Sequence, residues 1–379
     1  MSRSLSDQPT RLSQLSELQN ELAAASVRSI FVVADAVAFR ESGAADFVQR
    51  IAASHAQVTL FQDFQANPQL EDAVHAASAF ANSDADVIVA VGGGSAIDIA
   101  KLARSIATDN TLAFQQIRGT QSWQPDGRPF WAVPTTSGSG SEATQFAVVY
   151  AQGQKYSLSH PGLRANLVVL DAELTMSCPP RLTASCGLDA LCQAVESMWS
   201  NQATEDSVID AEQALRLAFS SLRQAVHAPN KQVRQAMIEA AHLAGRAIQV
   251  SKTTAPHALS YYLTSQFGIP HGFAVATNLV RCLSFNAEVS EQNLNEDRGL
   301  THVRQQIQRI VEACGAATLT EAAERLNSLI VDVGGQTSIV GWDISNDQIP
   351  AIAASVNVQR LQNNPRKATS ADLIRLLSD

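Results

Sequence analysis

The chain has 379 residues, which at roughly 100–200 residues per domain predicts two domains. Hydrophobic residues make up 45% of the sequence and charged residues 17%, a composition that excludes a mainly disordered or fibrous protein. The formal net charge of −9 argues against binding to nucleic acid or to an anionic membrane, so an anionic ligand would need a local cationic pocket.

No apolar run approaches the ~20 residues that span a bilayer, and the N-terminal segment lacks the hydrophobic core of a signal peptide. The five cysteines, an odd number, form no CxxC pair. We therefore expect reduced thiols in a cytoplasmic protein.

Short apolar runs alternate with helical periodicity in the first half of the chain. Helices are predicted over 11–25, from just after Asp35 to about residue 53, and over 70–82. Strands are predicted at 29–34, 57–61, 86–91, 130–134 and 166–170. The run at 86–91 has no polar alternation, which is typical of a parallel sheet covered on both faces. This pattern indicates an open α/β sheet.

The composition changes near residues 178–182, where two prolines follow Cys178. Past this point few strand runs occur, and the helical patterns lie at 187–200, 206–226, 230–249, 256–266 and 300–315. We therefore predict an α/β protein with an N-terminal dinucleotide-binding parallel sheet domain, residues 1–178. An all-helical C-terminal domain, residues 179–379, would follow it.

A glycine-rich turn follows the predicted strand at 86–91 and consists of Gly92, Gly93, Gly94 and Ser95. Glycines let the backbone approach a ligand, and a helix that begins here directs N–H groups and its dipole at an anion such as pyrophosphate. A tight strand–helix turn explains the same residues, because the motif is neither GxGxxG nor a Walker loop.

Two further segments are suited to a dinucleotide. Residues 134–142 hold five hydroxyls and two glycines, which can donate to phosphate or ribose, although a solvated loop has the same composition. Asp35 ends the strand at 29–34, where a carboxylate accepts from ribose hydroxyls and repels a 2′-phosphate. Turn formation or helix capping is an equally ordinary use of an Asp at this place.

A metal site is suggested by four side chains of the second half. Asp189 and Gln193 are four residues apart and share a helix face. Together with His257 and His271, the carboxylate can bind a divalent metal with an open position, and Gln193 adds a neutral oxygen. Each histidine taken alone is also explained as a satisfied structural residue.

Positive side chains occur at two places, namely Lys155, His160 and Arg164 in one segment and Lys252 in another, five residues before His257. On an acidic protein, cations beside a predicted metal ligand suggest an anionic ligand. Surface solubility is the ordinary alternative for lysine and arginine.

Taken together these segments resemble the iron-containing (group III) alcohol dehydrogenases over roughly residues 10–375. The motifs that carry the resemblance are GGGSAIDIAK (92–101), PTTSGSGSEAT (134–144), GLDALCQAVES (187–197) and GIPHGFAVA (268–276). The order and spacing of four separate motifs make it specific. The resemblance implies a dehydroquinate synthase-like fold and NAD(P)H-dependent oxidoreductase activity with a divalent metal. We also expect a homodimer.

The resemblance assigns residues to the cofactor and to the metal. For the cofactor these are Asp35, Gly92, Gly93, Gly94, Ser95, Asp98, Thr135, Thr136, Ser139 and Lys155. An acidic residue at position 35 goes with NAD(H) rather than NADP(H). The family binds its metal through one Asp and three His, and Asp189, His257 and His271 match three of these positions, whereas Gln193 occupies the fourth. Imidazole suits Fe²⁺ and Zn²⁺ better than an amide oxygen does, so the choice between Fe²⁺ and Zn²⁺ stays open.

Within the family, residues 155–164, 187–200 and 251–272 resemble the phosphonoacetaldehyde reductases (hydroxyethylphosphonate dehydrogenases). We therefore predict reversible reduction of phosphonoacetaldehyde to 2-hydroxyethylphosphonate by metal-assisted hydride transfer. Tyr261, in place of another family histidine, is the candidate proton donor. The candidate ligands of the anionic aldehyde are His160, Arg164, Lys252, Thr253 and Thr254.

Three alternatives stay open at this point. The substrate could be another small aldehyde, such as sulfoacetaldehyde, or an uncharged one resembling lactaldehyde. The chain could instead be a lyase that uses bound NAD, as dehydroquinate synthase does. Loss of a ligand histidine would also fit a binding protein without catalytic activity.

Overall fold

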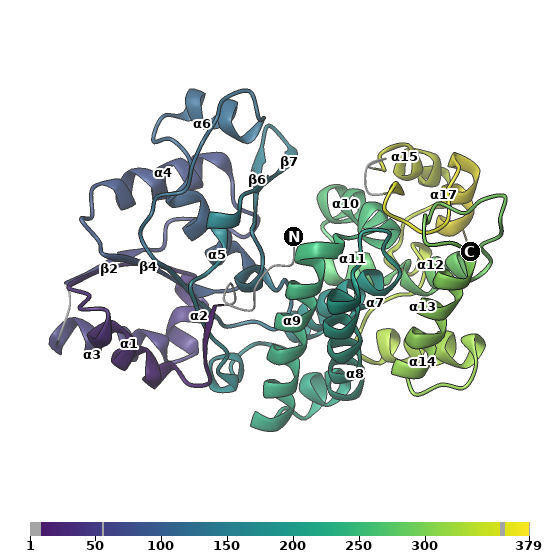
Figure 1. Cartoon of the computed structure of the whole chain (residues 1–379), viewed down its shortest axis with the longest axis horizontal. Coiled ribbons are helices and arrows are strands. Elements are labelled where there is room, and N and C mark those ends of the chain that lie inside the picture. The colour runs from purple at the N-terminus through teal and green to yellow at the C-terminus, as the bar shows by residue number, and fades with distance from the viewer. Residues whose placement is uncertain (1–8, 55–56, 357–360, 379) are drawn as a thin grey trace. The chain divides into compact units, whose positions relative to one another are not determined.

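The computed structural model describes residues 9–54, 57–356 and 361–378. Two compact units divide the chain (Figure 1). Unit 1 contains Met1–Thr136 and Ser141–Cys178, and unit 2 contains Ser137–Gly140 and Pro179–Asp379. Residues 1–8, on which part of the signal-peptide argument depends, lie outside the described residues.

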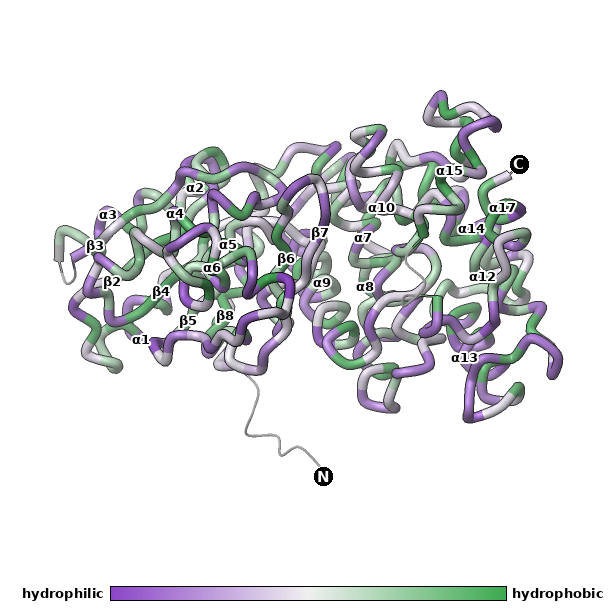
Figure 2. Tube along the Cα trace, turned by 90° about the horizontal axis from the view of Figure 1, so that it is seen from above, coloured by the Kyte–Doolittle hydropathy of each residue, from purple (hydrophilic) through white to green (hydrophobic). Residues whose placement is uncertain are grey.

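Unit 1 is built on a six-stranded parallel sheet with the strand order β1-β8-β5-β4-β2-β3. Its strands are β1 (Thr10–Leu12), β2 (Ser29–Ala34), β3 (Gln57–Phe61), β4 (Val87–Gly92), β5 (Phe130–Pro134) and β8 (Leu167–Val169). Every residue of β4 and β5 is buried, and the hydrophobic colour along β4 is visible in Figure 2. Central strands without polar alternation are expected where both faces of a parallel sheet are covered.

The described part of unit 1 also contains six α-helices and one hairpin, besides four short 3₁₀ helices. The helices are α1 (Leu18–Ala24), α2 (Ala36–Glu41), α3 (Ala44–Ser54), α4 (Leu70–Ala81), α5 (Gly94–Ala103) and α6 (Asn110–Ile117). The hairpin consists of β6 (Phe146–Ala151) and β7 (Gln154–Ser159), which pair antiparallel.

Two of the predicted helices are wrong in part. The segment at 11–25 begins as β1, which pairs with β8 at the sheet edge, and becomes α-helical only at Leu18, after a 3₁₀ turn at Leu15–Glu17. The long helix after Asp35 is two helices, because the chain turns at Gly43 with φ +79°. In both places a leucine or alanine spacing that fits a helix continues across a change of backbone conformation.

Unit 2 is built of helices, which are α7 (Pro180–Trp199), α8 (Glu205–His227), α9 (Lys231–Ser251), α10 (Ala255–Phe267), α11 (His271–Ala276), α12 (Leu279–Ala287), α13 (Leu300–Ala313), α14 (Leu319–Asp332), α15 (Ile349–Ala354) and α17 (Ser370–Leu377). α7 lies at the centre, packed against α8, α9, α11 and α13. From Gly187 onward all its residues are buried. A parallel sheet domain followed by a helical domain confirms the predicted fold class.

A bilayer-spanning helix is not found in the described part of the chain, where none is both long and apolar enough.

Candidate metal centre and cofactor site

The glycine-rich turn lies at a switch point of the unit 1 sheet. β2 connects onward to β3 on one side, whereas β4 connects onward to β5 on the other, although β2 and β4 are neighbours. Open α/β sheets bind ligands at the carboxyl ends of strands where the order reverses in this way. Asp35 follows β2 and Gly92 ends β4, so both predicted cofactor residues lie at this position.

Gly92 has no room for a side chain. Its φ is +155°, and a Cβ added there would lie 2.7 Å from Cβ of Ala96 and 3.3 Å from Cβ of Asp35. The close approach brings the end of β4 directly against the start of α5, whose first N–H groups have no partner within the helix. This arrangement is the one that holds a pyrophosphate at a helix N-terminus.

Asp35 acts as a helix cap, which was one of the two sequence interpretations. Its Oδ1 accepts from the N–H groups of Val37 and Ala38, at 3.1 and 2.8 Å, and so caps α2. Its Oδ2 has no hydrogen-bond partner among the described residues and stays available to accept from a ribose hydroxyl. The half-buried carboxylate is therefore both a helix cap and a candidate ribose ligand.

The predicted residues for the nicotinamide half are distributed over both units. Thr135 is buried with an unpartnered Oγ1, which is a position where a ligand acceptor would be favourable. Thr136 lies beside the turn, with Oγ1 3.1 Å from a Cβ placed on Gly93. Ser139 belongs to unit 2, where its carbonyl accepts from Nε2 of Gln193 at 3.5 Å.

The Asp and Lys of the GGGSAIDIAK motif form a buried network. Asp98 accepts from Oγ of Ser141 at 2.6 Å and from N–H of Val148 at 3.0 Å, so its two oxygens are already used within unit 1. Burial lowers the pKa of Lys101 to about 8, although the carboxylates of Asp98 and Glu142 act in the opposite direction. Lys155, predicted to lie near the ribose, is exposed on β7.

A polar stripe runs along one face of α7 and provides half of the candidate metal centre. Asp189, Gln193 and Glu196 follow at intervals of four and three residues, which keeps them on one helix face, and Ser200 follows directly after the last residue of α7. None of the four is more than 7% exposed. Buried polar side chains need partners, so the stripe must face other polar groups or a ligand.

His257 of α10 and His271 of α11 meet this stripe. Nε2 of His257 lies 3.2 Å from Oδ1 of Asp189, and Nε2 of His271 lies 4.0 Å from the same oxygen. The three ligand atoms lie within 4.8 Å of one another. Ligands ~2.1 Å from one ion are about 3–4 Å apart, so these groups can close on a single divalent metal.

Gly272 explains how His271 comes so close to α7. A Cβ at this position would lie 1.7 Å from the carbonyl oxygen of Ser185 and 2.9 Å from the backbone nitrogen of Asp189. Only glycine allows α11 to pack directly on α7 here. The contact fixes the residue next to His271 against the residue that carries the carboxylate ligand.

Glu196 is a site residue that the sequence argument did not single out. Its side chain is fully buried, its Oε2 contacts Nδ1 of His257, and its Oε1 accepts from the N–H and hydroxyl of Thr254 at 2.8 and 2.9 Å. Because a carboxylate only accepts, Nδ1 is the donor, which leaves Nε2 to face Asp189. A carboxylate behind a histidine ligand fixes its tautomer and orientation.

The charged groups of the candidate metal centre shift one another's pKa values. Burial alone would lower the pKa of His257, but the carboxylates of Glu196 and Asp189 outweigh it and raise the pKa to about 10. Burial would raise the pKa of Asp189, yet the histidines and Gln193 hold it below its ordinary value. Two buried carboxylates around two imidazoles form a site that favours a cation.

Gln193 is the fourth predicted metal ligand. Its Nε2 is directed at the carbonyl of Ser139, whereas its buried Oε1 has no partner among the described residues. An amide oxygen buried without a donor is costly, so Oε1 of Gln193 is a candidate acceptor for a bound group. The fit to a divalent metal rests on the donor set of one carboxylate and two imidazoles, whose ligand atoms lie within 4.8 Å of one another.

The other candidates in unit 2 lie on or just before α10. Tyr261 is half-buried four residues after His257, and its ring is parallel to that of His271 at 6.3 Å. Lys252 and Thr253 join α9 to α10. The hydroxyl of Thr254 donates to Glu196 and accepts from the indole N–H of Trp199, so it is already used within unit 2.

His160 and Arg164 are in unit 1 and line a pocket of about 470 Å³ together with Arg104. The pocket includes Asn166, whose N–H donates to the carbonyl of Phe130 at the start of β5. It therefore lies at the amino end of β5, whereas the glycine turn lies at the carboxyl ends of the strands. The structure does not bring these two residues to the glycine turn.

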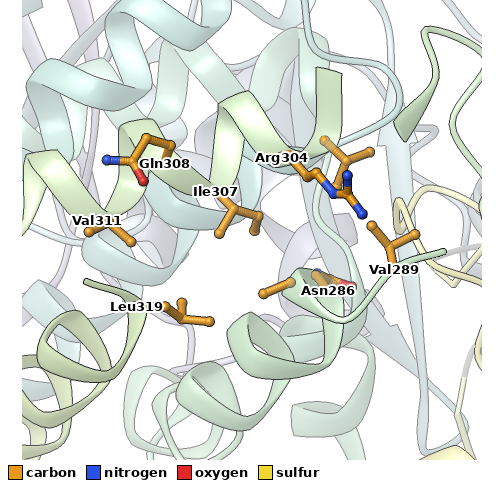
Figure 3. A pocket seen from close by; sticks show the side chains of 9 residues that line it. Asn286, Val289, Arg304, Ile307, Gln308, Val311 and Leu319 are labelled. Atoms are coloured by element: carbon orange, nitrogen blue, oxygen red, sulfur yellow. The ribbon is translucent and has the colours of Figure 1, made fainter. Parts of the chain in front are cut away.

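A further pocket of unit 2, of about 100 Å³, lies between α12, α13 and α14 (Figure 3). Its lining is mainly apolar and includes Val289, Ile307 and Leu319, with Arg304 and Gln308 beside them. It contains none of the residues predicted for the metal, the cofactor or the substrate.

The comparison with known proteins agrees with this geometry. Residues 11–172 match the iron-containing alcohol dehydrogenase family, and residues 183–379 match the C-terminal part of the Fe-containing alcohol dehydrogenases. This chain belongs to the iron-containing alcohol dehydrogenase family. The predicted family and the predicted enzyme class, a dehydrogenase or reductase, are therefore confirmed.

Relatives within the family act on different aldehydes and alcohols. The chain is 36% identical to phosphonoacetaldehyde reductase of Streptomyces viridochromogenes over 78% of this chain and 76% of the relative. It is 28% identical to sulfoacetaldehyde reductase of Bilophila wadsworthia over 97% and 95% of the two chains. The crystal structure of sulfoacetaldehyde reductase from Bifidobacterium kashiwanohense in complex with NAD⁺ is similar with a TM-score of 0.88 at 27% identity, covering 100% of this chain and 98% of that chain.

Proposed function

We propose that the protein reduces phosphonoacetaldehyde reversibly to 2-hydroxyethylphosphonate with NADH. A hydride forms the new C–H bond at the carbonyl carbon, a proton goes to the oxygen, and NAD⁺ is released. The observation that carries the proposal is the convergence of Asp189, His257 and His271, whose ligand atoms lie within 4.8 Å of one another. The similarity to phosphonoacetaldehyde and sulfoacetaldehyde reductases supports a small anionic aldehyde as the substrate class.

When bound, a divalent metal supplies Lewis acidity toward the carbonyl oxygen, and the nicotinamide supplies the hydride. Asp189, Gln193, His257 and His271 would hold the metal, whether Fe²⁺ or Zn²⁺, and Glu196 would keep His257 in the required tautomer. Tyr261, stacked beside His271, would deliver the proton to the oxygen. Homodimer formation is part of the proposal only as an expectation from the family.

For the cofactor, the Gly92–Ser95 turn would hold the pyrophosphate and Asp35 the adenosine ribose. A carboxylate beside a 2′-phosphate disfavours NADPH by ~1–3 kcal/mol, or about 5–150-fold. Asp35→Asn keeps a side-chain oxygen that can cap α2 and removes the charge. We expect this variant to lose most of the preference for NADH, and equal kcat/KM for both cofactors in the unaltered enzyme would contradict the assignment.

The deciding experiment follows NADH and NADPH oxidation with a panel of aldehydes, on metal-stripped protein and on protein refilled with Fe²⁺ or Zn²⁺. The panel contains phosphonoacetaldehyde, sulfoacetaldehyde and neutral propanal. We expect turnover only after refilling, with the highest kcat/KM for phosphonoacetaldehyde. A preference for propanal would replace the substrate assignment, and full activity without metal would remove the Lewis acid from the mechanism.

A further inference from the structure

Lys252 has a backbone conformation that is ordinarily restricted to glycine. It ends α9 with φ +60° and ψ −176°. A Cβ makes this region of backbone space unfavourable, and non-glycine residues are found there only where their surroundings impose it. Such strain concentrates at functional sites, and Lys252 lies five residues before the candidate metal ligand His257.

Buried hydrogen bonds hold the residues on both sides of Lys252. Nδ2 of Asn363 donates to the carbonyl of Ser251 at 2.7 Å and to the carbonyl of Thr253 at 3.1 Å. One amide group thus bridges the strained residue and fixes the direction of the chain before and after it. Asn363 is 4% exposed, so water does not compete effectively for these bonds.

The strained segment is also fastened to the metal centre. The N–H of Thr254 donates to the same Glu196 that contacts His257, and the indole N–H of Trp199 donates to the hydroxyl of Thr254 at 2.8 Å. The Lys252 side chain is half-buried, with Nζ donating to the carbonyl of Gln249 at 3.0 Å. The strained backbone of Lys252 is therefore two residues away from Thr254, which shares the carboxylate of Glu196 with the candidate ligand His257.

We propose that Lys252 determines specificity for negatively charged aldehydes, and that the strained backbone is kept because an ammonium is needed at this position. This inference rests on the proposed function. A glycine would remove the strain, yet it would also remove the cation that meets a phosphonate or sulfonate. Replacing Lys252 by glycine is thus expected to raise the stability of the protein and to weaken its recognition of the anion.

Three variants of the metal-loaded full-length enzyme separate strain from charge. Lys252→Gly removes both, Lys252→Ala removes the charge and keeps the strained Cβ, and Lys252→Arg keeps both. We expect the glycine and alanine variants to lose about 10-fold or more in kcat/KM for phosphonoacetaldehyde and sulfoacetaldehyde, as loss of a charge-assisted hydrogen bond predicts, and less than about threefold for propanal. The arginine variant should keep most of the preference for anions.

Melting temperature provides the second measurement. Lys252→Gly should raise it by a few degrees, as expected for relief of backbone strain, whereas Lys252→Ala should not. Asp343→Gly, at another positive-φ residue (φ +60°) that is exposed and outside the site, is the control for introducing glycine and should not alter substrate preference.

Three results would overturn the proposal. Retained kcat/KM for both anionic aldehydes in Lys252→Gly would show that the charge is not used. Equal losses on anionic and neutral aldehydes would give Lys252 a role in positioning instead, and an unchanged melting temperature in Lys252→Gly would remove the strain argument. Failure of the unaltered enzyme to reduce any aldehyde, propanal included, would instead contradict the proposed function.

Discussion

The two units each contain a buried network of charged side chains. The networks differ in whether protein groups provide a hydrogen-bond partner for every buried polar atom. In unit 1 the ammonium of Lys101 donates to the carbonyl oxygens of Ser141, Thr144 and Phe146 at 2.6, 3.0 and 2.7 Å. Three donors thus meet three backbone acceptors. In unit 2 the carboxylate of Asp189 and the imidazoles converge, and the buried amide oxygen of Gln193, on the same face of α7 as Asp189, has no donor among the described residues.

This difference separates a structural network from a functional one. Buried polar groups in native proteins are nearly always hydrogen-bonded, so a saturated network needs no ligand to explain it. A buried carboxylate between two imidazoles, all three with ligand atoms within 4.8 Å of one another, is instead a donor set that favours a bound cation. By the same reasoning, Lys101 has a structural role in unit 1 and Asp189 a functional role in unit 2. Both residues are nevertheless charged, buried and part of family motifs.

The largest effect is expected from removing the charge of the metal centre. Asp189→Asn keeps the shape of the side chain and removes the anionic ligand. We expect loss of bound metal and a fall in kcat of about 1,000-fold or more, since metal Lewis acidity contributes several kcal/mol and each ~1.4 kcal/mol is tenfold. Metal content measured by mass spectrometry and steady-state kinetics test this. Asp297→Asn, on an exposed loop, is the matched control, and an Asp189 variant that keeps metal and rate would refute the ligand assignment.

The saturated network should respond in stability instead. Lys101→Met removes the ammonium and leaves Asp98 buried without its cationic neighbour, which we expect to cost about 3–5 kcal/mol in the free energy of unfolding. Urea unfolding followed by circular dichroism measures this loss. Bound metal should be unchanged in the folded variant. Adding Asp98→Asn should recover part of the stability, and strictly additive losses would mean that the two residues act independently.

Glu196 combines features of both networks. Its carboxylate has hydrogen-bond partners within the protein, and it also contacts the candidate metal ligand His257. Glu196→Gln removes the anionic acceptor for Nδ1 of His257 while keeping the size of the side chain. Outer-shell partners of this kind contribute about 10–100-fold in metal affinity, so we expect a loss in that range with the fold preserved. Chelator competition gives the affinity, and an unchanged value would reduce Glu196 to an anchor for Thr254.

The fold could be predicted from the sequence where the hydrophobic periodicity and the length of an apolar segment indicate the same kind of element. The strands at 29–34, 57–61 and 130–134 occur where they were predicted, because each is a short apolar run between turn residues. β1 was hidden because Leu12 continues the leucine spacing of the following helix, although backbone pairing with β8 decides its conformation. Pairing between distant segments has no local pattern to indicate it.

The site was accessible only in part, for a similar reason. Asp189, His257 and His271 were identified from residue type and motif, and the structure brings them together. Glu196 lies seven residues after Asp189 on the same helix face, so a search for a charged residue in an apolar helix could have found it. The strain at Lys252 could not have been found, because lysine gives no sign of positive φ in a sequence.

The smallest expected change concerns Gln193, the position that departs from the family's three histidines. Gln193→His would place an imidazole on the buried face of α7, in place of an amide whose hydrogen bond helps to lower the pKa of Asp189. Imidazole binds Fe²⁺ and Zn²⁺ better than an amide oxygen does, so we expect metal affinity to rise by about 10-fold, as a gain of ~1.4 kcal/mol gives. The larger ring must fit where Nε2 now donates to the carbonyl of Ser139, so kcat need not rise with affinity. Chelator competition on Gln193→His and on Gln193→Ala decides the point. If both variants bind metal as the unaltered enzyme does, Gln193 is not a ligand, and the unpartnered oxygen must be explained by another group.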